Sequence, residues 1–108
     1  MRSRFFIGVT QSFKTVIETE DENISRRNIR IKINDNYYLM GNRNYVTVGD
    51  VIEYKEGDLI TIEVMYTGAI NIIKLDGVTV ISGIGNKQYS FTASKNHKLI
   101  VNINFNTP

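Results

Sequence analysis

The chain has 108 residues, of which 42% are hydrophobic and 22% charged, and its formal net charge is +2 at pH 7. This length suits one domain whose hydrophobic core can be stable without disulfides or other crosslinks. Because cysteine is absent and histidine occurs once, the composition excludes disulfides, thiolate nucleophiles, cysteine-based zinc sites and multi-histidine metal sites. No stretch reaches the roughly 20 apolar residues of a membrane span, and the N-terminus lacks the apolar region of a signal peptide. We therefore expect no cofactor, no membrane association and no export by a signal peptide.

The first predicted elements are a strand, an ambiguous segment and a loop. Residues 4–10 (RFFIGVT) have the composition of a short strand. Residues 12–22 fit two structures, because Ser12 could cap a helix while the many β-branched residues favour a strand. The acidic residues of this segment lie at the wrong end for a helix dipole, so we favour the strand. Residues 21–27 form a polar loop.

Residues 28–34 (NIRIKIN) alternate between isoleucine and polar side chains, which predicts a half-buried antiparallel strand. Its isoleucines point inward, and Arg30 and Lys32 point outward. The residues that follow it, Asn34, Asp35 and Asn36, have turn chemistry. The next predicted elements are a partner strand at 37–40, a turn at 41–44, and short strands at 45–48 and 51–55.

Residues 57–81 are predicted to be the centre of the sheet structure. Ile60, Ile62 and Val64 point one way, while Thr61 and Glu63 point the other. Asp76-Gly77 supplies a two-residue hairpin turn between two β-branched runs. The alternation breaks at Ile72-Ile73, which predicts either a bulge or burial on both faces.

The remaining chain continues the same spacing. Residues 82–87 are predicted to be a glycine-rich hairpin loop, residues 88–93 a strand with Tyr89 and Phe91 on one face, and residues 94–97 a polar turn with a solvated His97. A last strand follows at 98–105. Turn signals recur about every 8 to 12 residues, so we predict an all-β antiparallel β-sandwich of roughly nine strands in one domain, residues 1–108.

From Val48 onward the order of elements resembles the immunoglobulin-like "bacterial repeat" modules of phage virion and bacterial surface proteins. The matching features are Gly57-Asp58, the strand 61–64, the strand 70–75 with Asp76-Gly77, the strand Tyr89-Ser90-Phe91-Thr92, the polar turn 94–97 and the closing strand 99–105. The resemblance implies an Ig-like module at 46–108 that spaces, adheres or decorates without catalysis. Residues 1–45 have no counterpart, so we expect them to be an N-terminal β extension that anchors the module. The chain has neither a tandem array nor a signal peptide, which favours the virion setting over the cell surface.

One basic cluster with nearby aromatic and basic side chains is the candidate partner-binding site. Its residues are Arg26, Arg27, Arg30, Lys32, Tyr37, Tyr38 and Arg43. Three interpretations stay open: a solvated outer face, a surface that binds single-stranded nucleic acid by stacking and phosphate neutralisation, and a surface that docks on an acidic neighbouring protein subunit.

The acidic residues do not form a recognised catalytic or metal motif. Asp50 and Asp58 each follow a glycine and are expected to form turns, because the dense alternation of a calcium loop is missing. We therefore expect no enzyme activity and no metal site. The predicted function is a structural or interaction protein, in particular a phage virion component that decorates the capsid, acts as an auxiliary protein or attaches a fibre. It would be made in the host cytoplasm, bind capsid or tail subunits, and could form homo-oligomers; the alternative is a small β-barrel that binds single-stranded nucleic acid.

Overall fold

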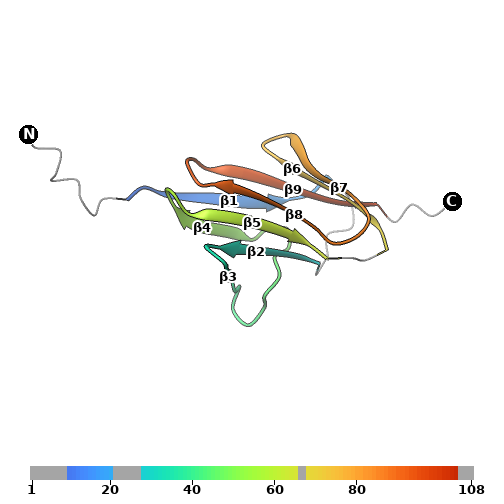
Figure 1. The fold of residues 1–108 in the computed structure, drawn as a ribbon, viewed down its shortest axis with the longest axis horizontal. Coiled ribbons are helices and arrows are strands. Elements are labelled where there is room, and N and C mark those ends of the chain that lie inside the picture. Colours follow the sequence, from blue (N-terminus) through green and yellow to red (C-terminus); the bar gives the residue numbers. More distant parts are fainter. Residues whose placement is uncertain (1–9, 21–27, 66–67, 105–108) are drawn as a thin grey trace, which may run out of the picture.

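The computed structural model describes residues 10–20, 28–65 and 68–104, and within these ranges it contains strands and no helix (Figure 1). No membrane-spanning helix is therefore found in the part of the chain that is described. The strands are β1 (Ser12–Glu18), β2 (Ile29–Ile33), β3 (Asn36–Tyr37), β4 (Val51–Lys55), β5 (Leu59–Val64), β6 (Ile70–Leu75), β7 (Val78–Gly83), β8 (Lys87–Thr92) and β9 (His97–Asn104). The prediction of an all-β fold is confirmed, and the ambiguous segment at 12–22 provides a strand.

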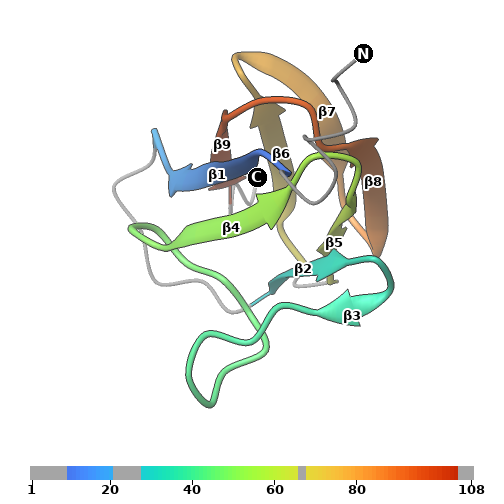
Figure 2. The same ribbon diagram turned by 90° about the vertical axis from the view of Figure 1, so that its left-hand side faces the viewer.

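The strands form two sheets that pack face to face, as the view along the strands shows (Figure 2). Sheet A has the order β4-β1-β9-β6-β7, and sheet B has the order β3-β2-β5-β8. The predicted sandwich is therefore confirmed. Its detailed Ig-like character stays a prediction that rests on the resemblance.

The core lies between the two sheets and is built from the residues that alternate along the strands. Sheet B contributes the inward isoleucines and valine of β2 and β5, and sheet A contributes the inward residues of β1, β4, β6 and β9. Side chains at most 2% exposed include Ile29, Ile31, Ile60, Ile62, Val64, Ile17, Ile52, Ile73 and Leu99. Each fully buried aliphatic side chain stabilises the fold by about 1.5 to 3 kcal/mol relative to exposure. For β2, β5 and β9, the predicted inward faces are thus the observed ones.

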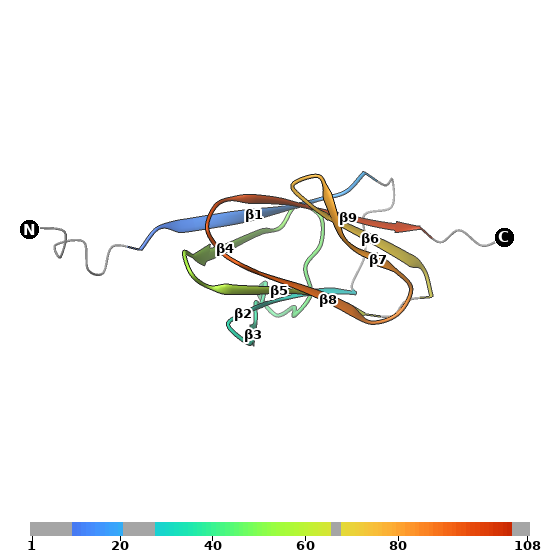
Figure 3. The ribbon, with the colours of Figure 1, turned by 45° about the horizontal axis from the view of Figure 1, so that its top comes forward.

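One strand pair runs parallel, whereas every other ladder among the described strands is antiparallel. It joins β1 to β9, with Thr15 opposite His97 and Glu18 opposite Ile100 (Figure 3). A parallel pair needs a long connection, and here the rest of the chain provides it. Two of the three strands before residue 45 are inner strands: β1 lies between β4 and β9, and β2 lies between β3 and β5, whereas β3 is an edge strand.

Two turns follow the chemistry that the sequence predicts. Asn34 and Asp35 have φ values of 52° and 73°, and Asp76 and Gly77 have φ values of 52° and 86°. Positive φ at both central residues matches the right-handed twist of the flanking strands, and Asn, Asp and Gly tolerate it. The break at Ile72-Ile73 is neither a bulge in β6 nor burial on both faces, because β6 pairs with β9 without a shift and its burial alternates, with Asn71 and Ile73 buried and Ile72 only partly so. The register against β7 does shift, between Ile73 and Lys74, but its extra residue is Val80 on β7.

The region 37–50 corrects the sequence prediction, because residues 45–48 are not a strand and the strand predicted at 37–40 is limited to Asn36–Tyr37. The Tyr38 N–H donates to Ile31 O at 2.7 Å, and the Val46 N–H donates to Ile29 O at 2.8 Å. Val46 is only 2% exposed. The segment thus covers the outer edge of β2 with single hydrogen bonds instead of a regular ladder.

The glycine-rich segment at 82–87 also differs from its prediction. It is not a hairpin loop, because β7 belongs to sheet A and β8 to sheet B, so the segment crosses between the sheets. The cause is that β8 pairs with β5, a strand more than 20 residues earlier, over six residue pairs. Residues 4–9 of the strand predicted at 4–10, the loop predicted at 21–27 and Phe105 lie outside the described residues, and residue 10 is not in a strand.

Candidate interaction surface

Four polar side chains gather on the outer face of sheet B, and we call this set the docking face: Arg30 and Lys32 on β2, Tyr37 on β3 and Glu63 on β5. The strand register brings them together, because Arg30 lies opposite Glu63 and Lys32 lies opposite Tyr37. Cross-strand neighbours of this kind have Cβ atoms about 5 Å apart, close enough for direct contact.

Glu63 is the centre of the docking face. Its carboxylate accepts a hydrogen bond from Tyr37 Oη at 2.9 Å, and lies 3.1 Å from Lys32 Nζ and 3.9 Å from Arg30 Nε. The Glu63 side chain is only 14% exposed. Burial raises the pKa of Glu63, but the bonds from Tyr37 and Lys32 and the nearby positive charges outweigh burial and hold that pKa below its ordinary value.

The Tyr37 ring lies beneath both cations of the docking face. The Arg30 guanidinium carbon is 4.9 Å from the ring centroid, and Lys32 Nζ is 5.2 Å from it. Both distances allow a cation–π attraction of about 0.5 to 1 kcal/mol at an exposed site. Tyr37 remains 38% exposed, so its ring is held in place yet available to a partner.

A groove of about 460 Å³ borders the docking face and runs toward β8. Its lining includes Arg30, Tyr37, Glu63, Met65, Lys87 and Gln88. Arg30 Nη2 donates to Met65 Sδ at 3.2 Å, so the arginine contacts the groove wall and Glu63 together. The groove combines an aromatic ring, a thioether and groups of both charges.

The other predicted site residues lie elsewhere. Tyr38 packs partly against the core, and its Oη accepts a hydrogen bond from the Glu53 N–H at 3.5 Å. Arg43 Nη2 pairs with Asp50 Oδ1 at 3.3 Å, and its guanidinium carbon lies 5.1 Å from the Tyr45 ring centroid. Arg26 and Arg27 lie outside the described residues. Of the predicted site residues, the structure therefore brings together Arg30, Lys32 and Tyr37.

Sequence reasoning missed the acidic member of the docking face and the groove residues on β8. Alternation does place Glu63 on the outer side of β5, which is the available signal. Alternation does not tell which strands pair, and only the pairing of β2 with β5 puts Glu63 beside Arg30 and Lys32. Lys87 and Gln88 reach the groove because β8 pairs with the other side of β5.

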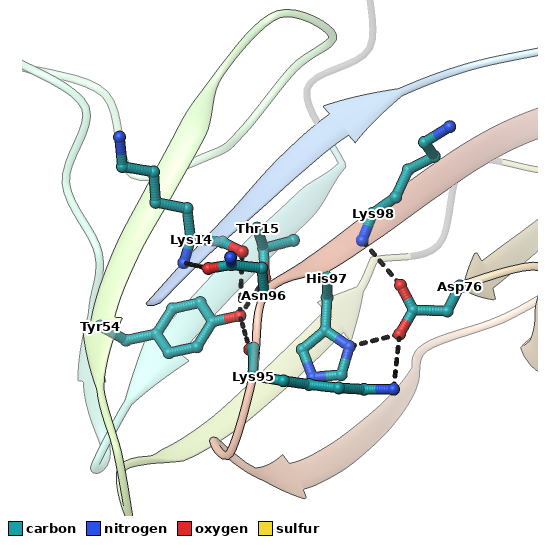
Figure 4. Close-up of polar contacts among 8 residues, drawn as sticks. All are labelled: Lys14, Thr15, Tyr54, Asp76, Lys95, Asn96, His97 and Lys98. Atoms are coloured by element: carbon teal, nitrogen blue, oxygen red, sulfur yellow. Dashed lines mark hydrogen bonds and ion pairs between the residues drawn. The ribbon is translucent and has the colours of Figure 1, made fainter. Parts of the chain in front are cut away.

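A second polar cluster lies where the turn before β9 meets the turn between β6 and β7 (Figure 4). Asp76 bonds the His97 ring through Oδ2 and accepts from the Lys98 N–H through Oδ1 at 2.9 Å. The His97 side chain is only 7% exposed and contacts the Phe91 ring edge to face at 4.7 Å. The prediction of a solvated His97 is therefore wrong, because Asp76 and Phe91 enclose the imidazole.

The bonds around Asp76 favour its charged form. Partial burial raises the pKa of Asp76, but the bonds from the Lys98 backbone and His97, together with the charges of His97 and Lys95, hold that pKa below its ordinary value. Nearby, Tyr54 Oη lies 2.6 Å from Thr15 Oγ1, and burial raises the Tyr54 pKa (Figure 4). The bonds of Asp76 fasten the turn between β6 and β7 to β9, and the bond between Tyr54 and Thr15 fastens β4 to β1.

The acidic turn residues have the structural roles that the sequence predicts. Asp58 Oδ2 accepts from the Lys55 N–H at 2.9 Å, and Asp50 Oδ2 accepts from the Thr47 N–H at 2.9 Å. No group of three or more His, Cys, Asp or Glu side chains suited to a metal ion occurs within residues 10–20, 28–65 and 68–104. The described polar clusters thus consist of groups that bind one another.

The fold and these surfaces define an all-β sandwich with a mixed-charge, aromatic outer face on sheet B. No protein-family model, no curated protein and no solved structure matches the chain.

Proposed function

We propose that this protein is a non-catalytic binding module that docks, through the docking face, on protein subunits of a larger assembly. The observation that carries the proposal is the position of Glu63 between Arg30 and Lys32. The carboxylate compensates one of the two positive charges and holds the Tyr37 hydroxyl. The result is an ordered, nearly balanced surface and not an open row of cations.

The chemistry of this surface is that of a protein interface. Tyrosine, arginine and methionine are enriched at interfaces, and the groove supplies Tyr37, Arg30 and Met65 side by side. Tyrosine and arginine are also the residues that most often carry binding energy. Because Tyr37 is held by Glu63 and both cations, little side-chain entropy remains to be lost when a partner binds.

The assembly that we propose is a phage virion, with this chain as a capsid decoration, auxiliary or fibre-attachment protein. The support is the resemblance of residues 48–105 to Ig-like virion modules, which remains an inference from sequence pattern. A virion presents its subunits many times, so a modest contact at each copy gives strong attachment when copies act together. The sandwich would then be the rigid body and the docking face its attachment point.

The test is the occupancy of this protein in purified particles from a culture that produces it. Particles are separated on a density gradient, and the chain is quantified by mass spectrometry for the wild type, Tyr37→Ala and the control Tyr45→Ala. A hot-spot tyrosine contributes about 2 kcal/mol, so Tyr37→Ala should lower occupancy roughly 30-fold at subsaturating protein. Tyr45→Ala should leave occupancy unchanged, since Tyr45 lies with Arg43 outside the docking face.

Circular dichroism and thermal unfolding must first show that both variants fold. Finding the wild type only in host cytosol would reject the virion setting. Equal occupancy of Tyr37→Ala and wild type would reject the docking face.

The alternative function, single-strand nucleic-acid binding, has one observation in its favour: Lys87 adds a further cation to the groove beside Tyr37. If it holds, a labelled oligonucleotide should bind the full chain, and the affinity should fall steeply between about 50 and about 200 mM salt. Removing the compensating charge with Glu63→Gln should then strengthen binding at low salt, while Arg30→Ala should weaken it. Fluorescence anisotropy measures all three proteins, and no binding at about 50 mM salt would exclude this function.

A further inference from the structure

The open edges of the two sheets are not equally protected. An edge strand presents unpaired backbone groups that can pair with another chain, and proteins usually block them. On β4, the N–H of Glu53 donates to Tyr38 Oη and the N–H of Lys55 donates to Asp58 Oδ2. On sheet B, β3 and the irregular segment that follows it up to Val46 cover the edge of β2. At the far end of sheet A, the register shift against β6 interrupts β7.

The edge of β8 has none of these protections among the described residues. It pairs with β5 over six residue pairs without a register shift, and it ends sheet B. The Ala93 N–H donates to Asp58 O, and backbone groups of successive residues in an antiparallel ladder alternate in direction. The backbone groups of Gln88, Ser90 and Thr92 therefore point away from β5 toward the open side.

After Lys87 at its start, the sequence of this edge is also free of charge. From Gln88 to Ser94 the residues are Gln, Tyr, Ser, Phe, Thr, Ala and Ser, and the outward residues Gln88, Ser90 and Thr92 are exposed. By contrast, the β4 edge carries Glu53 and Lys55. A regular strand of β-favouring residues with a single charge at one end is the kind of edge to which another strand adds.

We propose that two copies of this chain associate by antiparallel pairing of their β8 strands about a two-fold axis at Ser90. This interface goes beyond the proposed docking on an assembly, because it joins the protein to itself. Sheet B would continue through the axis into the sheet B of the second copy.

The residues of β8 are self-complementary in this register. Ser90 lies opposite Ser90 of the other copy, and Gln88 lies opposite Thr92, so all outward backbone groups of the three residues find partners. On the inner face, Tyr89 lies opposite Phe91, and these two rings already pack within one chain at 6.4 Å. Lys87 lies opposite Ala93, so the pairing places no like charges together. Ile84, which precedes β8 and is 52% exposed, adds apolar surface beside this edge.

The first test is the oligomeric state of Ser90→Pro compared with Ser90→Ala, measured by sedimentation over a range of concentrations. The proline removes the outward N–H and leaves the β5 ladder intact, since the Ser90 N–H does not face β5. Both variants lose the Ser90 Oγ contact with Thr61 Oγ1, so they differ only in the proline ring, which removes the backbone donor and occupies the space in front of it. Two-fold symmetry removes the bond twice, so Ser90→Pro should raise the dimer Kd at least about tenfold over Ser90→Ala.

The second test uses disulfide formation to read the register, which is possible because the chain has no cysteine. Hydrogen-bonded partners have Cα atoms about 5.5 Å apart, within the disulfide range. Ser90→Cys should therefore crosslink to itself under mild oxidation. Gln88→Cys alone should not, because its copies lie four residues apart along the strand, about 14 Å. A mixture of Gln88→Cys and Thr92→Cys should crosslink as the heterodimer.

Three results would overturn the proposal. The first is a wild type that stays monomeric at all concentrations. The second is equal dimerisation of Ser90→Pro and Ser90→Ala. The third is loss of the dimer on deletion of residues 1–9, which would mean that the N-terminal segment and not β8 makes the contact.

Discussion

Asn71 is a polar side chain near the start of β6, with no exposed surface. Its Oδ1 accepts from Asn28 Nδ2 at 2.9 Å, and its Nδ2 donates to Ala69 O at 3.3 Å. Asn28 Nδ2 also donates to Met65 O at 3.3 Å. The pair therefore joins the start of β2 in sheet B to β6 in sheet A. Buried polar groups are stable when bonded and costly when left without a partner.

We expect Asn71→Ala to lower the free energy of unfolding by about 2 kcal/mol, because it removes a buried acceptor and leaves the Asn28 amide underbonded. Urea unfolding of the wild type and the variant measures the difference. The double variant Asn28→Ala with Asn71→Ala should lose less than the sum of the two single losses, since both partners are then absent. Strictly additive losses would mean that the bond between the two amides does not stabilise the protein.

At the residue scale, the role of a side chain could be predicted where it contacts residues close in sequence. It could not be predicted where the contacts are with residues far away in sequence. The turn roles of Asp50 and Asp58 follow from local chemistry and were predictable. The enclosure of His97 was not, because Asp76 lies 21 positions earlier in the chain. Asn71 was missed for the same reason, since its partner Asn28 lies 43 positions away.

At the scale of elements, alternation predicted most strands together with their inner faces, because a half-buried strand must place apolar residues at every second position. The hairpin turns at Asn34-Asp35 and Asp76-Gly77 were predictable since both need positive φ. Residues 45–48 were mistaken for a strand, whereas Val46 is buried from an irregular segment. The segment 82–87 was misassigned as a hairpin loop because the sequence around it does not indicate that β8 pairs with β5.

At the scale of the molecule, the two sheets draw strands from both halves of the chain. Residues before 45 provide β1, β2 and β3; β1 lies between β4 and β9, and β2 lies between β3 and β5. The sequence indicates a boundary near 45 through its resemblance to a module, yet the hydrogen bonds of β4, β5 and β9 extend across it. Strand order is decided by such long-range pairing, which a single sequence does not reveal.

We therefore expect a fragment of residues 46–108 to lack a cooperative unfolding transition, although it holds most of the strands. Without β1, the strands β4 and β9 lose a neighbour, and without β2 the core loses Ile29 and Ile31. Thermal circular dichroism of the fragment beside the full chain measures this. A sharp transition of the fragment would show instead that 46–108 is an independent module.

The parallel pair of β1 and β9 has a mechanical consequence. If the molecule is pulled at the start of β1 and the end of β9, the two strands are drawn in opposite directions along their own axes (Figure 1). Their ladder from Thr15–His97 to Glu18–Ile100 is then loaded in shear, so its hydrogen bonds must break together and not one after another. A hairpin pulled at its open end would instead unzip bond by bond. The sandwich is thus built to bear tension applied along its length.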